Sequence, residues 1–135
     1  MSAEIKNRYI EAVGRRKTAI ARVRITPGTK TSFLVNDKDV KEYFVTEDLQ
    51  SIAQEALSKS EIAEKFTVTV QVMGGGIHAQ AEAVRHGLSR TLVERDEVVK
   101  NTLKKLGFLK RDSRQVERKK FGLKKARKAP TWSKR

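Results

Sequence analysis

The sequence predicts an α+β fold: a two-layer sandwich in which helices pack on one face of a mixed four-stranded sheet, followed by an extended basic C-terminal arm. Some stretches alternate between apolar and polar residues, as strands do, and others have apolar residues at helical spacing. Along the chain they give the order β-β-β-α-β-α-α. Residues 110–135 contain 12 basic and 2 acidic side chains, and so carry +10 of the net charge of +14. We therefore predict a globular domain over 1–109 and an arm over 110–135.

The first three strands are predicted at residues 8–13, 18–26 and 31–35. In the second, small and branched apolar side chains occupy alternate positions, which suits a helix packed closely over that face. The opposite face carries Arg22 and Arg24.

Two turns connect these strands. Gly14-Arg15-Arg16-Lys17 is predicted to form a tight basic turn after the first strand. Pro27 and Gly28 favour a turn after the second, because proline fixes φ and glycine accepts positive φ. This turn predicts a hairpin between the second and third strands.

Two helical segments and a fourth strand come next. Residues 38–44 are expected to form a helical turn, and residues 46–58 a helix with Thr46 as candidate N-cap. Residues 66–72 alternate between apolar side chains and Thr or Gln, which is typical of a half-buried strand.

Three glycines, Gly74 to Gly76, precede the longest predicted helix, 77–94. Its apolar stripe consists of Ile77, Ala81, Val84, Leu88 and Leu92, and its adjacent face carries His78, Glu82, Arg85, His86 and Ser89. A last helix is predicted over 96–106, because acidic residues begin it, lysines end it and Gly107 follows.

The composition excludes several classes of protein. The chain has no cysteine, which rules out disulfides, thiolate zinc sites and cysteine nucleophiles. It contains no apolar run of about 18 residues and no secretory signal pattern, so we expect a cytoplasmic protein without a membrane span. A pI near 10.3 favours nucleic acid as partner over an anionic membrane, since the arm lacks the pattern of an interfacial helix.

The glycine stretch allows three interpretations. It could be structural, letting the chain turn sharply and the helix approach a strand. It could bind an RNA phosphate or a nucleotide at the exposed N–H groups of the helix N-terminus. The nucleotide interpretation is the weakest, because the chain lacks the P-loop and dinucleotide-binding patterns and paired carboxylates for magnesium.

Two histidines and a basic cluster are further candidates. His78 and His86 lie eight residues apart without a third ligand beside them. Plain exposed polar side chains, or contacts to phosphates or base edges, are therefore favoured over metal binding or catalysis. We predict no metal, no cofactor and no enzymatic activity. The basic residues from Arg15 to Arg24 could be a solvated surface, but their density favours RNA contact. Tyr9 and Tyr43 could stack on bases or pack at the core.

The arm has too few apolar residues to offset the roughly 1–2 kcal/mol per residue of backbone entropy lost on ordering. Phe121 and Trp132 interrupt its cations, and Gly122 and Pro130 shape its path. This pattern favours an arm that threads through RNA and binds it with a steep salt dependence.

Three stretches resemble a known family: AVGRRKTAIARV at 12–23, GGGIHAQAEAVRHGLSRTL at 74–92 and RDSRQVERKKFGLKKARKAPTWSKR at 111–135. They are similar to the ninth protein of the small ribosomal subunit, of bacterial type. The chain departs from that pattern at Ala79, where the family more often has glycine, and at Thr131-Trp132, which replaces Gln-Phe.

The resemblance implies a domain like the second domain of the fifth small-subunit protein. It also implies binding to small-subunit ribosomal RNA in the head, next to other head proteins, and an arm that ends near the anticodon stem-loop of peptidyl-site tRNA. The tRNA contact is carried over to Ser133, Lys134 and Arg135. The expected ribosomal RNA contacts are Arg15, Arg16, Lys17, Arg22, Arg24, Gly74, Gly75, Gly76, His78, Arg85, His86, Arg111, Arg114, Arg118, Lys119, Lys120, Lys124, Lys125, Arg127 and Lys128.

Two other functions compete with this interpretation. The same broad architecture occurs in small-molecule kinases with glycine-rich loops, although the sequence offers no catalytic base or metal ligand. A general nucleic-acid chaperone would use the arm without specificity, and would bind DNA and RNA equally. The arm alone does not separate a chaperone from a ribosomal protein, whereas the combined motifs favour the latter.

Overall fold

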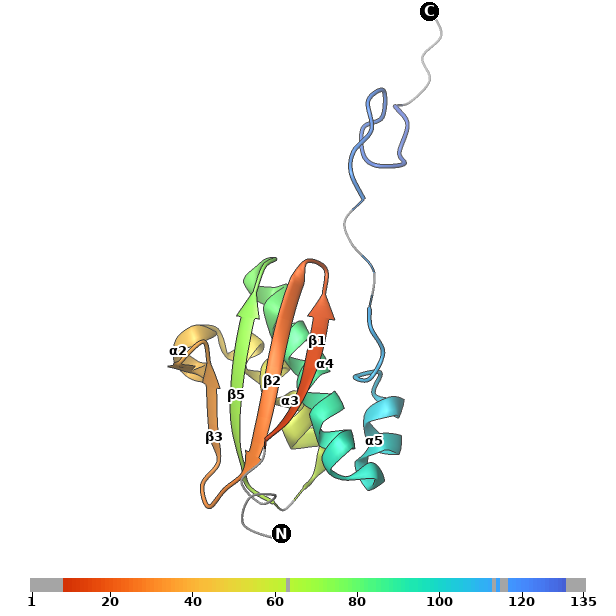
Figure 1. Cartoon of the computed structure of the whole chain (residues 1–135). Helices are drawn as coiled ribbons and strands as arrows, with labels where there is room; N and C mark the ends of the chain where they lie inside the picture. The colour runs from red at the N-terminus through yellow and green to blue at the C-terminus, as the bar shows by residue number, and fades with distance from the viewer. Residues whose placement is uncertain (1–8, 63, 113, 115–116, 131–135) are drawn as a thin grey trace, which may run out of the picture.

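A computed structural model describes residues 9–62, 64–112, 114 and 117–130, and it confirms a mixed sheet with helices on one face (Figure 1). The sheet has five strands in the order β1-β2-β5-β3-β4. The strands are β1 (Ile10–Arg16), β2 (Ala19–Pro27), β3 (Ser32–Val35), β4 (Lys38–Asp39) and β5 (Phe66–Met73). The helices are α2 (Val40–Tyr43), α3 (Glu47–Ser60), α4 (Ile77–Arg95), the 3₁₀ turn η1 (Glu97–Val99) and α5 (Lys100–Lys105).

The sequence predicted four strands, and the additional one in the structure is the short β4. It pairs antiparallel with the end of β3, and α2 follows it directly. The segment predicted as one helical turn at 38–44 is therefore a strand followed by a helix. A strand of two residues shows no alternation, so its sequence carries no strand pattern.

The predicted hairpin between the second and third strands is wrong. β5 lies between them, antiparallel to β2 and parallel to β3. The β2–β5 ladder joins Ile20–Pro27 to Phe66–Met73, whereas β3 is only four residues long. Beside β2, the long apolar face of β5 thus extends the core further than β3 could. The β2–β5 pairing therefore outweighs the preference of Pro27 and Gly28 for a hairpin between β2 and β3.

The basic turn after β1 is shorter than predicted. The antiparallel ladder continues to the pair Arg16–Ala19, so Arg15 and Arg16 belong to the strand. Only Lys17 and Thr18 form the turn, with Lys17 at a φ of 53°. Two-residue hairpin turns require such positive φ values because their twist matches that of the strands.

Helices α3 and α4 cover one face of the sheet. Figure 1 is viewed from the other face and shows both helices behind the strands. The β2 residues Ala19, Ala21, Val23 and Ile25 face α4 and are fully buried, which confirms the predicted packing face. Helix α4 and the sheet approach closely at Gly14 and Gly87. A Cβ on Gly14 would lie 2.0 Å from the Ala83 carbonyl oxygen, so only glycine permits this spacing.

Helix α4 confirms most of its predicted stripe. Ala81, Val84, Leu88 and Leu92 are fully buried, but Ile77 is 46% exposed. Ile77 is the first residue of the helix and directly follows the glycine turn. None of the described helices is long and apolar enough to cross a membrane.

The last predicted helix is divided into η1 and α5. The Asp96 side chain accepts from the backbone N–H of Val98 and starts the 3₁₀ turn. Gly107 follows α5 with a φ of 80°, as a helix C-terminus favours. Further along, the chain leads away from the sheet (Figure 1), and residues 121–127 form turns and bends.

Candidate nucleic-acid interface

The open face of the sheet presents the two arginines that the sequence predicts there. The Arg22 and Arg24 side chains are 54% and 41% exposed. Glu11, on the neighbouring strand, holds both: its Oε1 lies 3.2 Å from Arg22 Nε and its Oε2 3.1 Å from Arg24 Nε. Both ion pairs use Nε, which leaves the terminal amino groups of the guanidiniums as donors for another acceptor.

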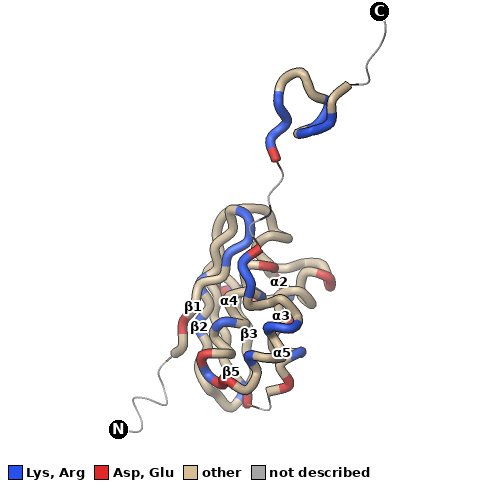
Figure 2. The backbone as a smooth tube through the Cα atoms, turned by 90° about the vertical axis from the view of Figure 1, so that its right-hand side faces the viewer, with Lys and Arg blue, Asp and Glu red and all other residues tan. Residues whose placement is uncertain are grey.

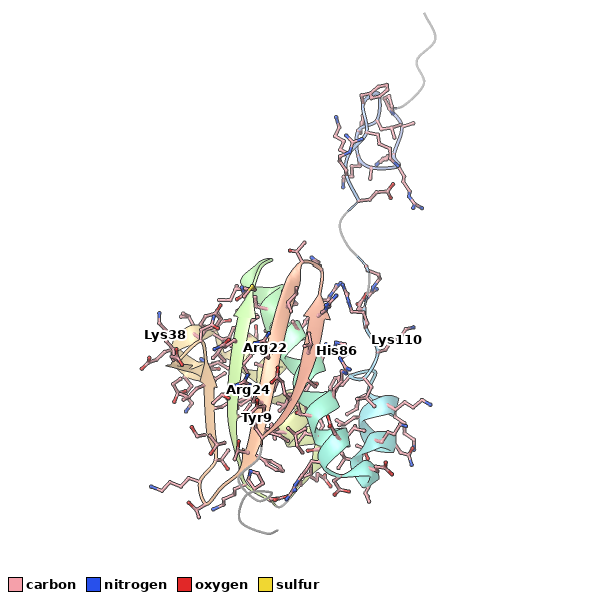
Figure 3. The ribbon with its side chains drawn as sticks, in the orientation of Figure 1. Tyr9, Arg22, Arg24, Lys38, His86 and Lys110 are labelled. Carbon is pink, nitrogen blue, oxygen red and sulfur yellow. The ribbon has the colours of Figure 1, made fainter. Side chains whose placement is uncertain are left out.

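An aromatic ring accompanies this pair. The Arg24 guanidinium lies 4.5 Å from the centre of the half-exposed Tyr9 ring, and Figure 3 shows both over the open face. Thr69 and Gln71 of β5 lie opposite Arg24 and Arg22 in the ladder. This face can therefore bind anions through its arginines and also hydrogen-bond to sugars or bases.

The glycine turn before α4 combines a structural role with an accessible helix end. Gly74 and Gly75 have φ values of 79° and 64°, and a Cβ on Gly74 would lie 2.6 Å from the Thr18 carbonyl oxygen. Gly76 has nothing within 4 Å of its Cβ position. The first turn of α4 contains no acidic residue and its N-cap makes no side-chain hydrogen bond. The turn can thus accept an anion at the helix N-terminus.

The two histidines lie apart and have different surroundings. His78 is exposed, with its Nδ1 3.4 Å from Glu82 Oε1. His86 Nδ1 accepts a hydrogen bond from the backbone N–H of Arg15 at 3.2 Å. Burial and the nearby Arg90 charge lower the His86 pKa, which favours the neutral ring that this bond requires. The described residues form no cluster of three candidate metal ligands.

Two arginines predicted as RNA contacts are engaged within the protein. Arg85 Nη1 donates to Glu55 Oε2 at 3.0 Å, and its guanidinium lies 4.7 Å from the Phe108 ring centre. The Arg16 side chain is only 14% exposed and its Nε donates to Glu82. Arg15 and Lys17, in contrast, are exposed.

The arm carries cations along most of its described length (Figure 2). Glu117 pairs with Lys120 at 2.6 Å and with Arg127 at 2.7 Å, and these bonds lower the Glu117 pKa. Phe121 is 96% exposed, so its ring is accessible to a partner. The exposed cations of its described residues are Lys110, Arg114, Arg118, Lys119, Lys120, Lys124, Lys125, Arg127 and Lys128, and Arg111 is partly buried. Trp132 and the predicted tRNA contacts Ser133, Lys134 and Arg135 lie outside the described residues.

Sequence reasoning did not find the acidic partners Glu11 and Asp112, nor the role of Glu82. Glu11 lies directly opposite Arg24 across the ladder, so the correct register of the first hairpin would have paired them. Asp112 and Glu82 approach Arg16 from distant parts of the chain. No spacing in the sequence indicates that contact.

An α+β domain with an arginine-bearing open sheet face, an accessible helix N-terminus and a cationic extension defines a class of RNA-binding proteins. The family model for ribosomal protein S9/S16 matches residues 14–135. The chain belongs to this family: it is a structural ribosomal protein that binds ribosomal RNA and acts in translation.

Proposed function

We propose that this chain is the ninth protein of the small ribosomal subunit, of bacterial type, and that it binds ribosomal RNA in the head through the domain and the arm together. The distribution of charge carries the proposal, because residues 110–135 hold +10 of the net +14. Such an arm suits a polyphosphate, whose neutralisation releases counterions and favours binding.

Three surfaces supply the proposed RNA contacts. The open face contributes Arg22 and Arg24, with Tyr9 beside them, to bind phosphates and bases. The glycine turn and His78 offer a second anion site. Exposed arm cations from Arg114 to Lys128, together with Arg15 and Lys17, complete the interface.

The finer part of the proposal concerns tRNA. We assign Ser133, Lys134 and Arg135 to contact with the anticodon stem-loop of peptidyl-site tRNA. Support comes from the family match, which extends to residue 135, and from the charge of Lys134 and Arg135. A cation far along a basic arm can contact a distant phosphate without moving a folded domain. We further propose that the functional units are 1–109 and 110–135, and that the protein works in the cytoplasm beside other head proteins.

Co-sedimentation tests the assignment to the subunit. Lysate is separated on a magnesium-containing gradient after a high-salt wash, and the fractions are probed for this chain. We expect one copy per small subunit. Release at moderate salt, with equal binding to DNA and RNA, would instead indicate a general nucleic-acid chaperone.

A deletion of Ser133 to Arg135 tests the tRNA contact. The truncated chain should still assemble into subunits, because the other surfaces remain. These subunits should bind peptidyl-site tRNA more weakly, and the difference should shrink at high salt. Unchanged tRNA binding across a range of salt would disprove this assignment while leaving ribosomal RNA binding untouched.

A further inference from the structure

The arm begins at a junction where side chains fasten it to the sheet and to α4. Arg16, at the end of β1, points to the helix side of the sheet and donates from Nε to Glu82 of α4. Its Nη1 donates to the backbone carbonyl of Arg114 and lies 3.6 Å from Asp112 Oδ1. One guanidinium therefore joins a strand, a helix and the start of the arm.

A second arginine fastens the same junction in the opposite direction. Arg111 extends from the arm and its Nη2 donates to the Lys17 carbonyl at 3.3 Å, in the turn between β1 and β2. His86 of α4 and Lys110 at the start of the arm, both labelled in Figure 3, line one pocket together with Arg16 and Asp112. The chain that leaves α5 is thus attached to the β1–β2 hairpin at two neighbouring points.

The edge of β1 beneath the junction is occupied by α4 side chains. Arg15 N–H donates to His86 Nδ1, and the Val13 carbonyl accepts from Arg90 Nη1 at 2.6 Å. Side chains that hydrogen-bond to the free backbone groups of an edge strand in this way oppose the addition of another strand. The arm is accordingly held by side chains at discrete points and does not extend the sheet.

Two carboxylates make this crowded cationic junction stable. Arg16 lies between Glu82 and Asp112, and Asp112 also pairs with Arg114 Nη2 at 2.9 Å. Hydrogen bonds from Arg114 lower the Asp112 pKa strongly, so this carboxylate stays ionised. The alternation of charges offsets the repulsion that several neighbouring arginines would otherwise cause.

We propose that Arg16 is a positioning residue: it fixes the direction in which the arm leaves the domain before RNA is bound. The idea rests on the proposed function, since it assigns Arg16 an indirect role in the same RNA interface. A side chain that is largely buried, makes two hydrogen bonds within the protein and is ion-paired with Asp112 is poorly placed to contact phosphate. Holding the arm in its bound direction lowers the conformational cost of association.

Distance measurements on the free, full-length protein test the positioning role. The chain has no cysteine, so Ser51→Cys on α3 and Lys119→Cys on the arm can carry a pair of spin labels. Arg16→Gln should broaden the distribution of distances between the labels. Arg16→Lys should do the same, because an ammonium cannot span Glu82 and the Arg114 carbonyl together. Arg15→Gln, which removes an adjacent exposed guanidinium, is the matched control and should leave the distribution narrow.

Asp112→Asn is a second variant that leaves the buried side of the junction unaltered, and it should also broaden the distribution. Circular dichroism of each variant verifies that the domain is folded. A wild-type distribution already as broad as that of Arg16→Gln would overturn the proposal. Because RNA is absent from these samples, this result would not depend on whether the arm binds RNA.

Salt titrations with small-subunit ribosomal RNA separate positioning from phosphate contact. A lost phosphate contact lowers the slope of log affinity against log salt by about one. We expect Arg15→Gln to lower that slope. Arg16→Gln should weaken binding with the slope unchanged. A slope lowered by about one in Arg16→Gln, without broadening of the label distances, would make Arg16 an ordinary phosphate contact.

Discussion

At the scale of single residues, the contact between Gly14 and Gly87 determines how closely α4 packs on the sheet. A Cβ on Gly87 would lie 2.7 Å from Val23 Cγ2 and 3.0 Å from the Gly14 nitrogen. The Val23 side chain is fully buried and has little freedom to move away. The two glycines therefore bring His86 and Arg90 within reach of the β1 backbone.

We predict that Gly87→Ala destabilises the domain by about 1–2 kcal/mol. Overpacking costs about 1–3 kcal/mol, and the higher helix propensity of alanine returns up to about 1 kcal/mol. Urea denaturation measures the change. Gly76→Ser is the control: its Cβ position is open and serine is a favoured N-cap, so the free energy of unfolding should not fall. An unchanged midpoint in Gly87→Ala would contradict the close packing.

We expect the stability of the domain to depend on pH through His86. Its pKa is lowered in the folded protein, chiefly by burial, from an ordinary value of 6.5. The unfolded chain therefore takes up the proton at a higher pH than the folded chain. The free energy of unfolding should fall as the pH drops through 6.5 toward the folded pKa.

The variant His86→Gln isolates this effect, because glutamine can still accept a hydrogen bond from Arg15 N–H but does not titrate. Urea denaturation between about pH 5 and 8 should show that the free energy of unfolding declines less on acidification in His86→Gln than in the wild type. Replacement of the exposed His78 by glutamine should leave the decline in place. Equal declines in the wild type and His86→Gln would contradict the assignment.

At the scale of elements, alternation predicted the two faces of β2 correctly. It placed Arg22 and Arg24 on the face opposite the helices, where the structure has them. It did not predict that β5 would separate β2 from β3, because strand order depends on which faces complete the core. Sequence patterns report the period of each segment, whereas the neighbours of a segment are set by long-range packing.

A double substitution of Arg22 and Arg24 by glutamine tests the open face as an RNA surface. Both side chains are partly exposed and form surface ion pairs, so stability should change by at most about 1 kcal/mol. The salt slope for ribosomal RNA should fall by about two, one for each lost phosphate contact. Lys59→Gln on α3 is a control on the helical layer and should keep the wild-type slope. A normal slope in the double variant would remove the open face from the interface.

At the scale of the whole molecule, every buried apolar residue in the described part of the chain lies between Ala19 and Phe108. We therefore predict that a fragment of residues 1–109 folds cooperatively, since it keeps this core and lacks only the polar contacts that Arg111, Asp112 and Arg114 make with the domain. Urea denaturation and amide hydrogen exchange measure this. Its affinity for ribosomal RNA should be much lower and less dependent on salt. Failure to fold would refute the division at residue 109.

The α+β fold was thus predictable from periodicity, and the alternation in β2 and β5 identified the core face. The division at residue 109, which rests on the charge imbalance, stays a prediction. The junction around Arg16 was not predictable, since Glu82 and Asp112 meet it from positions 66 and 96 residues away. A cation in the sequence does not reveal whether its partner is another part of the same chain or a ligand.

The central place of β5 also bears on how the protein folds during synthesis. The β1–β2 hairpin can form early from local contacts, but its inner edge stays unpaired until residues 66–73 have been made. Such long-range pairing slows folding and leaves a nascent strand edge open to other chains. Charged side chains on an exposed strand discourage that kind of aggregation. Arg22 and Arg24 can therefore protect the unfinished sheet before any RNA is present.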